Sequence, residues 1–337
     1  MCIIEAINHR RASFKPFILK GYIMTLAFFF PGQVSQSVGM GKDLYDNFSV
    51  AKDVFNEVDE AVCFKLSSLM FEGDMAELTK TVHAQPAIMA TSMAALKVIE
   101  KETGKNIQEL ASFVAGHSLG EYGALCAAGA LSLFDTAKLL KARGEYMQEA
   151  SLKNPGAMAA VLGLSLKEVN ELVNKACDET KKCYIANDNC QGQVVISGHK
   201  EAIEKAALFA PEMGAKKCVI LPVSGGFHSP LMEEAAVKMQ EELVKTNLVN
   251  PVIPVISNVT AEAETNADKI KELLVAQVTG SVRWTESVSY MQMKGVTDFV
   301  ECGNGKVLTG LIKRIVPDAR LLNVGTKDQV EQALSFF

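Results

Sequence analysis

The chain has 337 residues, of which 48% are hydrophobic and 22% charged, and its formal net charge at pH 7 is −5. This composition is typical of a globular enzyme, and the length suits one large domain with a smaller insertion. The negative balance offers no electrostatic support for a nucleic-acid partner, so we expect none.

Residues 1–23 place basic side chains ahead of an apolar stretch at 22–30, which resembles a signal peptide only faintly. No small-residue cleavage site follows, and the stretch is too short to cross a bilayer. We therefore interpret 1–23 as an appended segment, with Met24 as an alternative start, and expect no membrane association.

Strand-like and helix-like runs alternate along most of the chain, which predicts an α/β fold with a parallel sheet. The expected strands are 25–30, 112–116, 254–257, 296–302 and 321–324. The expected helices are 85–101, 133–150, 230–243, 285–294 and 307–315, with one more entered at Ser118 and another at the C-terminus. These elements predict a large α/β-hydrolase-like domain made of residues 24–151 and 224–337.

The middle of the chain has a different order of elements. Its expected strands are 157–162, 183–186, 193–197 and 217–223, and its expected helices are 165–176, with Ser165 as N-cap, and 200–213. A turn-rich link at 187–192 joins the second and third strands. The order β-α-β-β-α-β is ferredoxin-like and predicts a small inserted domain at 152–223.

The segment Gly116-His117-Ser118-Leu119-Gly120 fits Gly-x-Ser-x-Gly where an expected strand meets an expected helix. A tight turn there would push the serine hydroxyl outward, and flanking glycines would let the backbone make the turn. The helix N-terminus favours developing negative charge, and the Leu119 N–H is a natural oxyanion donor. A serine that only caps a helix would give the same pattern.

A nucleophilic serine needs a base, and the chain has five histidines. His228 follows an expected strand and a glycine pair and precedes a proline, which places it at the carboxyl end of a strand. His117 adjoins the serine, so its side chain should point away. Position alone fits His228 equally well as a base or as a capping histidine.

Arg143 lies beside the apolar face of the expected helix 133–150. A guanidinium at the margin of a core needs an anionic or polar partner. A structural ion pair is the simpler interpretation, and a bidentate clamp on a substrate carboxylate is the functional one.

Eight cysteines are present, with no Cys-x-x-Cys pair and no histidine cluster at zinc-ligand spacing. We therefore expect reduced thiols in a cytoplasmic protein, without a metal or other cofactor.

Five segments, in this order, resemble the malonyl-coenzyme A:acyl carrier protein transacylases of bacterial fatty-acid synthesis. They are Phe30-Pro31-Gly32-Gln33 with Ser35-Gln36; Gly116-His117-Ser118-Leu119-Gly120-Glu121-Tyr122; Lys141-Ala142-Arg143-Gly144; Phe227-His228-Ser229-Pro230-Leu231-Met232; and Arg283-Trp284-Thr285-Glu286-Ser287 with Gly305-Lys306-Val307-Leu308-Thr309-Gly310-Leu311. The resemblance runs from about Met24 to the C-terminus and agrees with the large-plus-small domain layout.

The resemblance implies a malonyltransferase that carries malonyl from malonyl-CoA to the phosphopantetheine thiol of acyl carrier protein. Ser118 would be the nucleophile and His228 the general base, while Gln33 and the Leu119 N–H would form the oxyanion hole. Arg143 would pair with the free malonyl carboxylate. A ping-pong exchange through an acyl-serine follows.

The resemblance further implies that a backbone carbonyl near Gln277 orients the histidine in place of a carboxylate. The chain departs from the family pattern at Val34, where glycine is usual, and at Asn304, in a loop that usually reads Gly-Pro-Gly. A β-branched residue would be strained if the turn at Val34 needs a positive φ.

Two other functions share parts of this pattern. A serine esterase or thioesterase would use the same elbow, usually with an acid before the histidine, and a non-catalytic carrier-protein-binding module would form no covalent adduct. We expect a monomer that docks an acidic carrier protein through a local basic patch. The candidates for that patch are Lys216, Lys217, Lys306, Lys313 and Arg314.

Overall fold

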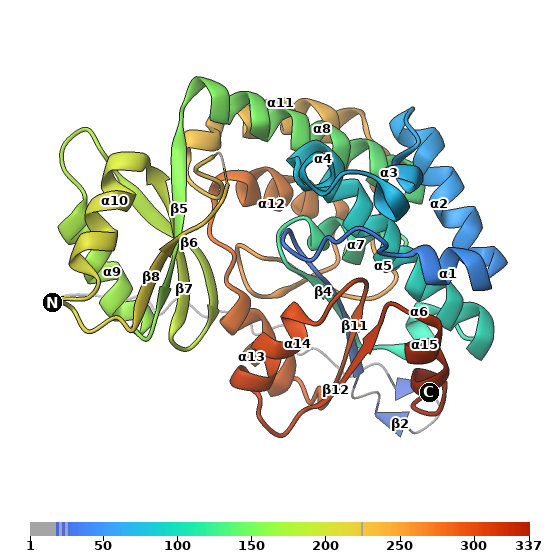
Figure 1. Cartoon of the computed structure of the whole chain (residues 1–337). Coiled ribbons are helices and arrows are strands. Elements are labelled where there is room, and N and C mark those ends of the chain that lie inside the picture. The colour runs from blue at the N-terminus through green and yellow to red at the C-terminus, as the bar shows by residue number, and fades with distance from the viewer. Residues whose placement is uncertain (1–17, 20–21, 24–25, 224) are drawn as a thin grey trace, which may run out of the picture.

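The structure, a computed structural model, describes residues 18–19, 22–23, 26–223 and 225–337. Most of the segment predicted to be appended, 1–23, lies outside these residues. Its described part forms two short antiparallel strands, β1 (Ile18–Leu19) and β2 (Tyr22–Ile23). A helix-covered body carries a smaller sheet at one side, which contains β5 to β8 (Figure 1).

The larger sheet has six strands. They are β3 (Leu26–Phe30), β4 (Phe113–Gly116), β9 (Val255–Ile256), β10 (Ala263–Glu264), β11 (Asp298–Cys302) and β12 (Arg320–Val324). They run in the order β10-β9-β4-β3-β11-β12, and every neighbouring pair is parallel except β9 with β10. The carboxyl ends of β3 and β4 therefore meet at one edge, where Phe30 pairs with Gly116.

Helices cover both faces of this sheet. They are α1 (Lys42–Asn47), α2 (Ser49–Val62), α3 (Leu66–Glu72), α4 (Met75–Thr79), α5 (Thr81–Thr103), α6 (Ile107–Leu110), α7 (Gly120–Ala127), α8 (Leu133–Lys153), α11 (Glu233–Lys245), α12 (Ala267–Thr279), α13 (Trp284–Met293), α14 (Val307–Ile315) and α15 (Lys327–Leu334). Phe28 and Phe30 pack into the core that contains α5 and α7, whereas Phe29 packs into the core with α13 and α14. Alternate side chains of β3 thus enter opposite cores, which explains its continuous apolar sequence.

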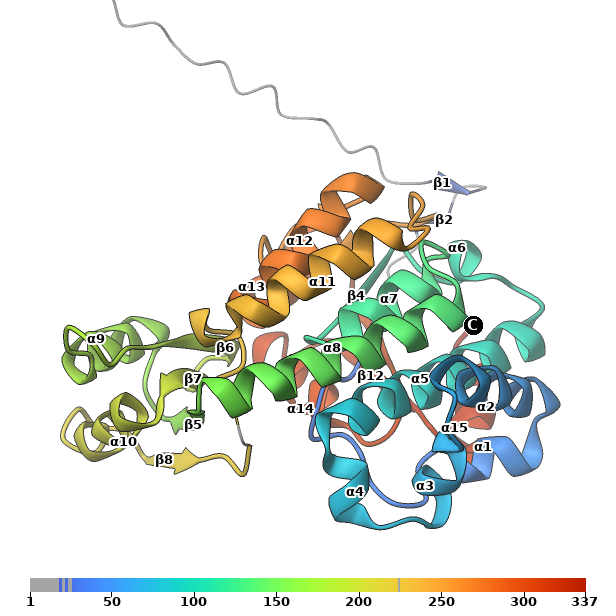
Figure 2. The same ribbon diagram turned by 90° about the horizontal axis from the view of Figure 1, so that it is seen from above.

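The smaller sheet has the order β6-β7-β5-β8 and is antiparallel throughout. Its elements are β5 (Gly156–Leu162), α9 (Leu166–Ala176), β6 (Cys183–Cys190), β7 (Gln193–His199), α10 (Lys200–Phe209) and β8 (Lys217–Ile220). The expected β-α-β-β-α-β order is confirmed, and Ser165 caps α9 by accepting from the Glu168 N–H. The boundaries 152–223 stay a prediction: α8 itself continues from the body toward β5 (Figure 2).

Three predicted boundaries in this region are wrong, one of them the end of β8, which is Ile220 and not 223. The link expected at 187–192 is mostly strand, because β6 continues to Cys190 with register shifts after Ile185 and Asp188. The Asn and Asp side chains that signalled a turn are buried there, and the Asp188 N–H bonds the Val282 carbonyl. Helix α10 ends at Phe209, not at 213, because Pro211 has no backbone N–H to continue the helical hydrogen bonds and turns follow instead.

Among the described helices, none is both long enough and apolar enough to span a bilayer.

Candidate active site

The turn between β4 and α7 holds Ser118 in a left-handed conformation, with φ of 53°. A Cβ atom on Gly116 would lie 1.9 Å from the Gly120 carbonyl carbon, and one on Gly120 would lie 2.1 Å from the Phe30 carbonyl oxygen. No side chain fits at either position, so both glycines are needed for the turn. The sequence expectation of a strand-turn-helix elbow is confirmed in its geometry.

His228 lies directly beside this serine, although 110 residues separate them in sequence. The Ser118 Oγ and His228 Nε2 atoms are 2.8 Å apart. His228 Nδ1 lies 2.9 Å from the Gln277 carbonyl oxygen and 3.1 Å from that of Gly280. Carbonyl oxygens only accept, so these contacts assign the proton to Nδ1 and leave Nε2 to accept from the serine hydroxyl.

The imidazole is kept neutral by its surroundings. Burial, together with the positive charge of Arg143, lowers the pKa of His228 to about 3. A neutral His228 can take a proton at pH 7, as a general base must.

Arg143, on α8, is 1% exposed. Its Nη1 donates to Gln85 Oε1 at 2.8 Å, and its Nη2 donates to Gln277 Oε1 at 3.0 Å and to Ser118 Oγ at 3.1 Å. These partners carry no charge, so the structural ion pair considered from the sequence does not describe this site. A desolvated cation with neutral partners is suited to bind an anionic group.

Three buried side chains that the sequence interpretation did not single out, Glu121, Asn258 and Gln85, support this centre. Gln277 Nε2 donates to Glu121 Oε2 at 2.6 Å and to the Ser118 carbonyl at 2.9 Å. Asn258 Oδ1 accepts from the Ser118 N–H at 2.7 Å, and Asn258 Nδ2 donates to the Gly116 carbonyl at 2.7 Å. The turn is therefore held on both sides by amides.

Burial raises the pKa of Glu121 to about 7, while its hydrogen bond from Gln277 opposes that change. Signals for two of these side chains were present in the sequence. Glu121 belongs to the serine motif, and Asn258 follows β9 at the carboxyl edge of the sheet, where functional groups collect.

The loop after β3 carries Gln33 and lies against the elbow. A Cβ atom on Gly32 would lie 2.7 Å from the His117 carbonyl oxygen, which shows how closely the two loops approach. Gln33 is half-buried beside this contact. Val34, next in the chain, has φ of 82°, so the strain expected for a β-branched residue is present.

His117 points away from Ser118, as expected, and its Nε2 lies 2.9 Å from Asn189 Oδ1. Burial lowers the pKa of His117.

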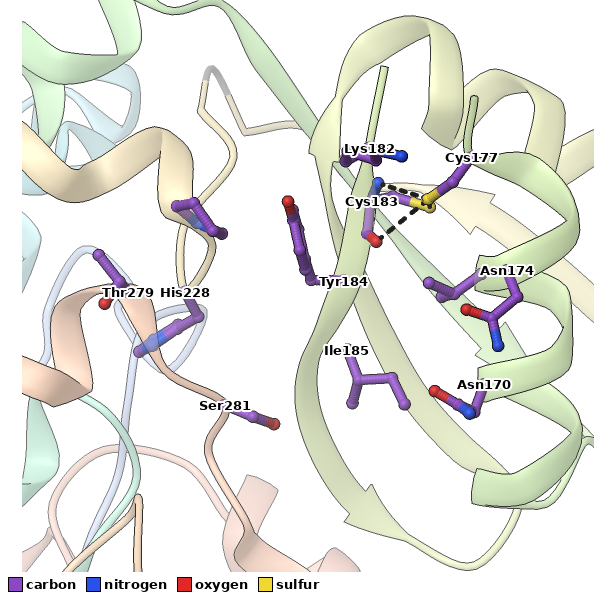
Figure 3. Close-up of a pocket in the computed structure, with 12 residues that line it drawn as sticks. Asn170, Asn174, Cys177, Lys182, Cys183, Tyr184, Ile185, His228, Thr279 and Ser281 are labelled. Atoms are coloured by element: carbon purple, nitrogen blue, oxygen red, sulfur yellow. Dashed lines mark hydrogen bonds between the residues drawn. The ribbon is translucent and has the colours of Figure 1, made fainter. Parts of the chain in front are cut away.

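A cavity of about 510 Å³ opens between the small sheet and the body and reaches His228. Figure 3 shows His228, Thr279 and Ser281 on one wall and Tyr184 and Ile185 facing them from β6. Asn170, Asn174 and Lys182 add amide and ammonium groups on the side of the small sheet. The cavity is lined by both polar and apolar side chains and includes the histidine of the serine-histidine pair.

Residues 27–323 match the family model of the acyl transferase domain. The malonyl CoA-acyl carrier protein transacylase of Bacillus subtilis (strain 168) is 46% identical over 309 residues, covering 92% of this chain and 96% of that protein.

The chain belongs to the malonyl CoA-acyl carrier protein transacylase family.

Solved structures of this family agree. The acyl-carrier-protein S-malonyltransferase of Bartonella henselae superposes with a TM-score of 0.90 at 50% identity, covering 93% of this chain and 99% of that one. A malonyl-transacylase solved in complex with a type II polyketide synthase acyl-carrier protein gives a TM-score of 0.88 at 37% identity, covering 93% and 99%. The resemblance read from five sequence segments and the predicted fold class are thereby confirmed for this transacylase.

Proposed function

We propose that this transacylase moves a malonyl group from malonyl-CoA to the phosphopantetheine thiol of an acyl carrier protein, through a malonyl ester on Ser118. The observation that carries the proposal is the 2.8 Å contact between Ser118 Oγ and His228 Nε2, beside the buried guanidinium of Arg143. The product would supply fatty-acid synthesis, in line with the family to which the chain belongs.

In the first half-reaction, Ser118 Oγ attacks the thioester carbon and His228 Nε2 takes the hydroxyl proton. The carbonyl oxygen becomes an oxyanion, which we expect the Leu119 N–H and Gln33 to stabilise. The Ser118 N–H cannot do so because it already donates to Asn258. The tetrahedral intermediate then collapses, the C–S bond breaks, and the coenzyme A sulfur leaves with the proton from His228.

The second half-reaction runs the same steps in reverse with a new thiol. His228 takes the proton of the phosphopantetheine thiol, and the sulfur attacks the malonyl ester. The Ser118 C–O bond breaks, and the serine oxygen recovers a proton from His228. One residue therefore serves as base and acid in alternation, which its neutral resting state allows.

Arg143 supports malonate as the acyl group. Only a methylene separates the two carbonyl carbons of malonate, so a carboxylate bound by Arg143 would hold the thioester carbon close to the serine. The 3.1 Å distance from Arg143 Nη2 to Ser118 Oγ fits this short spacing. A guanidinium can bind a carboxylate through two parallel hydrogen bonds.

Acyl carrier protein is the proposed acceptor, and the solved complex of a related malonyl-transacylase with a carrier protein supports it. Of the basic residues considered for docking, Arg314 already donates to Gln193 Oε1 and to the Gln191 carbonyl. Lys306 borders a separate hollow near α15 and stays among the candidates in this proposal. We also propose a cytoplasmic location, since the described cysteines are free thiols. A monomer is part of the same proposal.

Mass spectrometry tests the covalent step. The protein mixed with malonyl-CoA should gain one malonyl group on the peptide that contains Ser118, and holo acyl carrier protein should remove it. Ser118→Ala should gain nothing, whereas Ser335→Ala, at an exposed serine near the C-terminus, should behave as the wild type. Steady release of malonate without carrier protein would instead indicate a hydrolase, and carrier binding without any adduct a non-catalytic module.

A further inference from the structure

Two loops that are far apart in sequence are fastened together beside the elbow. Asn304 Nδ2 donates to the Ser35 carbonyl at 2.7 Å and to Ser37 Oγ at 2.9 Å. Next to it, a Cβ atom on Gly303 would lie 3.0 Å from Pro31 Cγ, so the Gly303 backbone lies close to the Pro31 ring. The loop at 303–305 therefore clamps the loop at 31–37 from outside.

The clamped loop contains a backbone conformation that its own residue disfavours. Val34 has φ of 82° and a side chain that is 73% exposed, so packing of that side chain offsets little of the strain. Within the loop, the Val34 N–H donates to Gln36 Oε1 at 2.8 Å, and Ser35 Oγ donates to the Gly32 carbonyl at 2.8 Å. A strained residue persists only where its surroundings impose the conformation.

Asn304 is the external anchor closest to that strain, because it binds the carbonyl of the residue directly after Val34. If the anchor were lost, Val34 could relax toward negative φ, and the peptide between Gln33 and Val34 would rotate. Gln33 would then change its direction relative to Ser118.

We propose that Asn304 is a positioning residue that holds Val34 in its left-handed conformation and thereby keeps Gln33 aimed at the oxyanion. The proposal rests on the proposed function, in which Gln33 is part of the oxyanion hole. Asn304 itself touches no reacting atom. Its effect should therefore fall on the rate of the chemical step and leave substrate affinity nearly unchanged.

A double-mutant cycle between Asn304 and Val34 tests this role. The measured quantity is the rate of Ser118 malonylation in a rapid-quench assay, with KM for malonyl-CoA measured alongside. Asn304→Ala should lower the rate roughly tenfold, which is less than the 10²–10³ expected for removing an oxyanion donor outright. Its KM should stay within about threefold of the wild type.

Glycine adopts positive φ without a steric penalty, so Val34→Gly should acylate at about the wild-type rate. In the Val34→Gly background, Asn304→Ala should lower the malonylation rate by less than about threefold, because a glycine at 34 needs no contact to keep its positive φ. In a Gln33→Ala background, Asn304→Ala should lower the malonylation rate hardly any further, because the side chain that Asn304 positions is already absent. Asn304→Asp keeps the side-chain shape but removes the donor, so it should resemble Asn304→Ala.

An equal loss from Asn304→Ala in the wild-type and Val34→Gly backgrounds would overturn the proposal, as would a wild-type rate in Asn304→Ala. A rise in KM with an unchanged rate would also contradict it. If Asn304→Ala does not fold, Asn304→Ser, whose hydroxyl is too short to reach both acceptors, enters the same cycle. Absence of any malonyl adduct on the wild type would reject the proposed function itself, so the two failures are distinct.

Discussion

The side-chain amide of Gln277 donates to the Glu121 carboxylate at 2.6 Å, with both residues buried. Because the nitrogen faces Glu121, the amide oxygen must face the other way, where it accepts from Arg143. The backbone carbonyl of the same residue accepts from His228. Gln277 thus joins the histidine and the arginine, and Glu121 fixes its orientation.

Glu121 should matter as a hydrogen-bond acceptor more than as a charge. Glu121→Gln can present an oxygen to Gln277, so we expect it to keep most of the malonylation rate. Glu121→Ala leaves one hydrogen of the Gln277 amide group without its acceptor, which costs about 1–3 kcal/mol, or roughly 5- to 150-fold in rate. Single-turnover acylation of both variants measures this difference.

Equal losses of malonylation rate in Glu121→Gln and Glu121→Ala would show that the rate depends on the negative charge of Glu121. Equal, near-wild-type rates would show that the orientation of Gln277 does not depend on Glu121. Thermal unfolding of each variant, measured at the same pH, separates a loss of rate from a loss of fold.

The pH dependence of acylation should reveal how strongly His228 is buried. A histidine of ordinary pKa, about 6.5, would lose its basic form as the pH falls through that value. Burial lowers the pKa of His228 to about 3, so we expect it to remain a competent base from pH 8 down to pH 5. Acylation kcat/KM should be measured in Glu121→Gln, because burial raises the pKa of Glu121 to about 7 and that group titrates in the same range.

A flat profile between pH 5 and 8 in that variant is the expected result, and a decline centred near 6.5 would contradict it.

The lowered pKa of His228 also affects the stability of the fold. Unfolded His228 binds a proton below about pH 6.5 while folded His228 does not until about pH 3. The free energy of unfolding should therefore decrease as the pH falls from about 6.5 to about 3.

Much of the site could be predicted because its chemistry follows local motifs. The glycines around Ser118 indicate a turn by themselves, and the five ordered segments contain His228, Arg143 and Gln33. Gln277 lies outside those segments and was implied by the family resemblance alone. Local sequence cannot show which distant groups support them. The contacts of Asn258 with the Ser118 turn join residues 140 and 142 positions apart, and no periodicity encodes that distance.

The fold shows the same division. Long apolar strands such as β3 were predicted within a residue, whereas the helices α1 to α4, between 42 and 79, were not among the predicted elements. Two of these begin without a side-chain cap at a left-handed glycine or an irregular residue, Gly41 and Lys65, so their starts carry little local signal. The β6 error has the opposite cause, since Asn187 and Asp188 give a turn signal that burial in a bulged strand overrides.

Arg143 should select malonyl over acetyl groups. Arg143→Ala removes the cation proposed to bind the free carboxylate, and a lost charged hydrogen bond is worth about 1.5–3 kcal/mol, roughly 10- to 150-fold in malonyl kcat/KM. Acetyl-CoA lacks the carboxylate, so its kcat/KM should fall much less or rise. Arg143→Lys keeps the charge without the planar guanidinium, so its malonyl kcat/KM should lie between those of the wild type and Arg143→Ala. Competition between labelled malonyl-CoA and acetyl-CoA measures the ratio, and an unchanged ratio in Arg143→Ala would refute the assignment.

The close contact between Gly120 and β3 should make this glycine indispensable, unlike its neighbour on the same helix. A Cβ atom on Gly120 would lie 2.1 Å from the Phe30 carbonyl oxygen and 2.9 Å from that of Pro31, and neither backbone atom can move aside freely. Gly120→Ala should therefore destabilise the fold by about 1–3 kcal/mol or more and displace the loop that carries Gln33.

Gly123→Ala is the matched control. A Cβ atom there would meet only side-chain atoms of Phe30, at 3.5 Å or more, which is ordinary contact. Alanine also favours the helix over glycine by up to about 1 kcal/mol, so stability should stay the same or rise. Urea unfolding of both variants gives the difference in the free energy of unfolding, and their acylation rates report whether the loop that carries Gln33 is displaced. If Gly120→Ala matched Gly123→Ala in stability and rate, the elbow would not depend on close packing of backbone against backbone, because a methyl group would fit where Phe30 now lies.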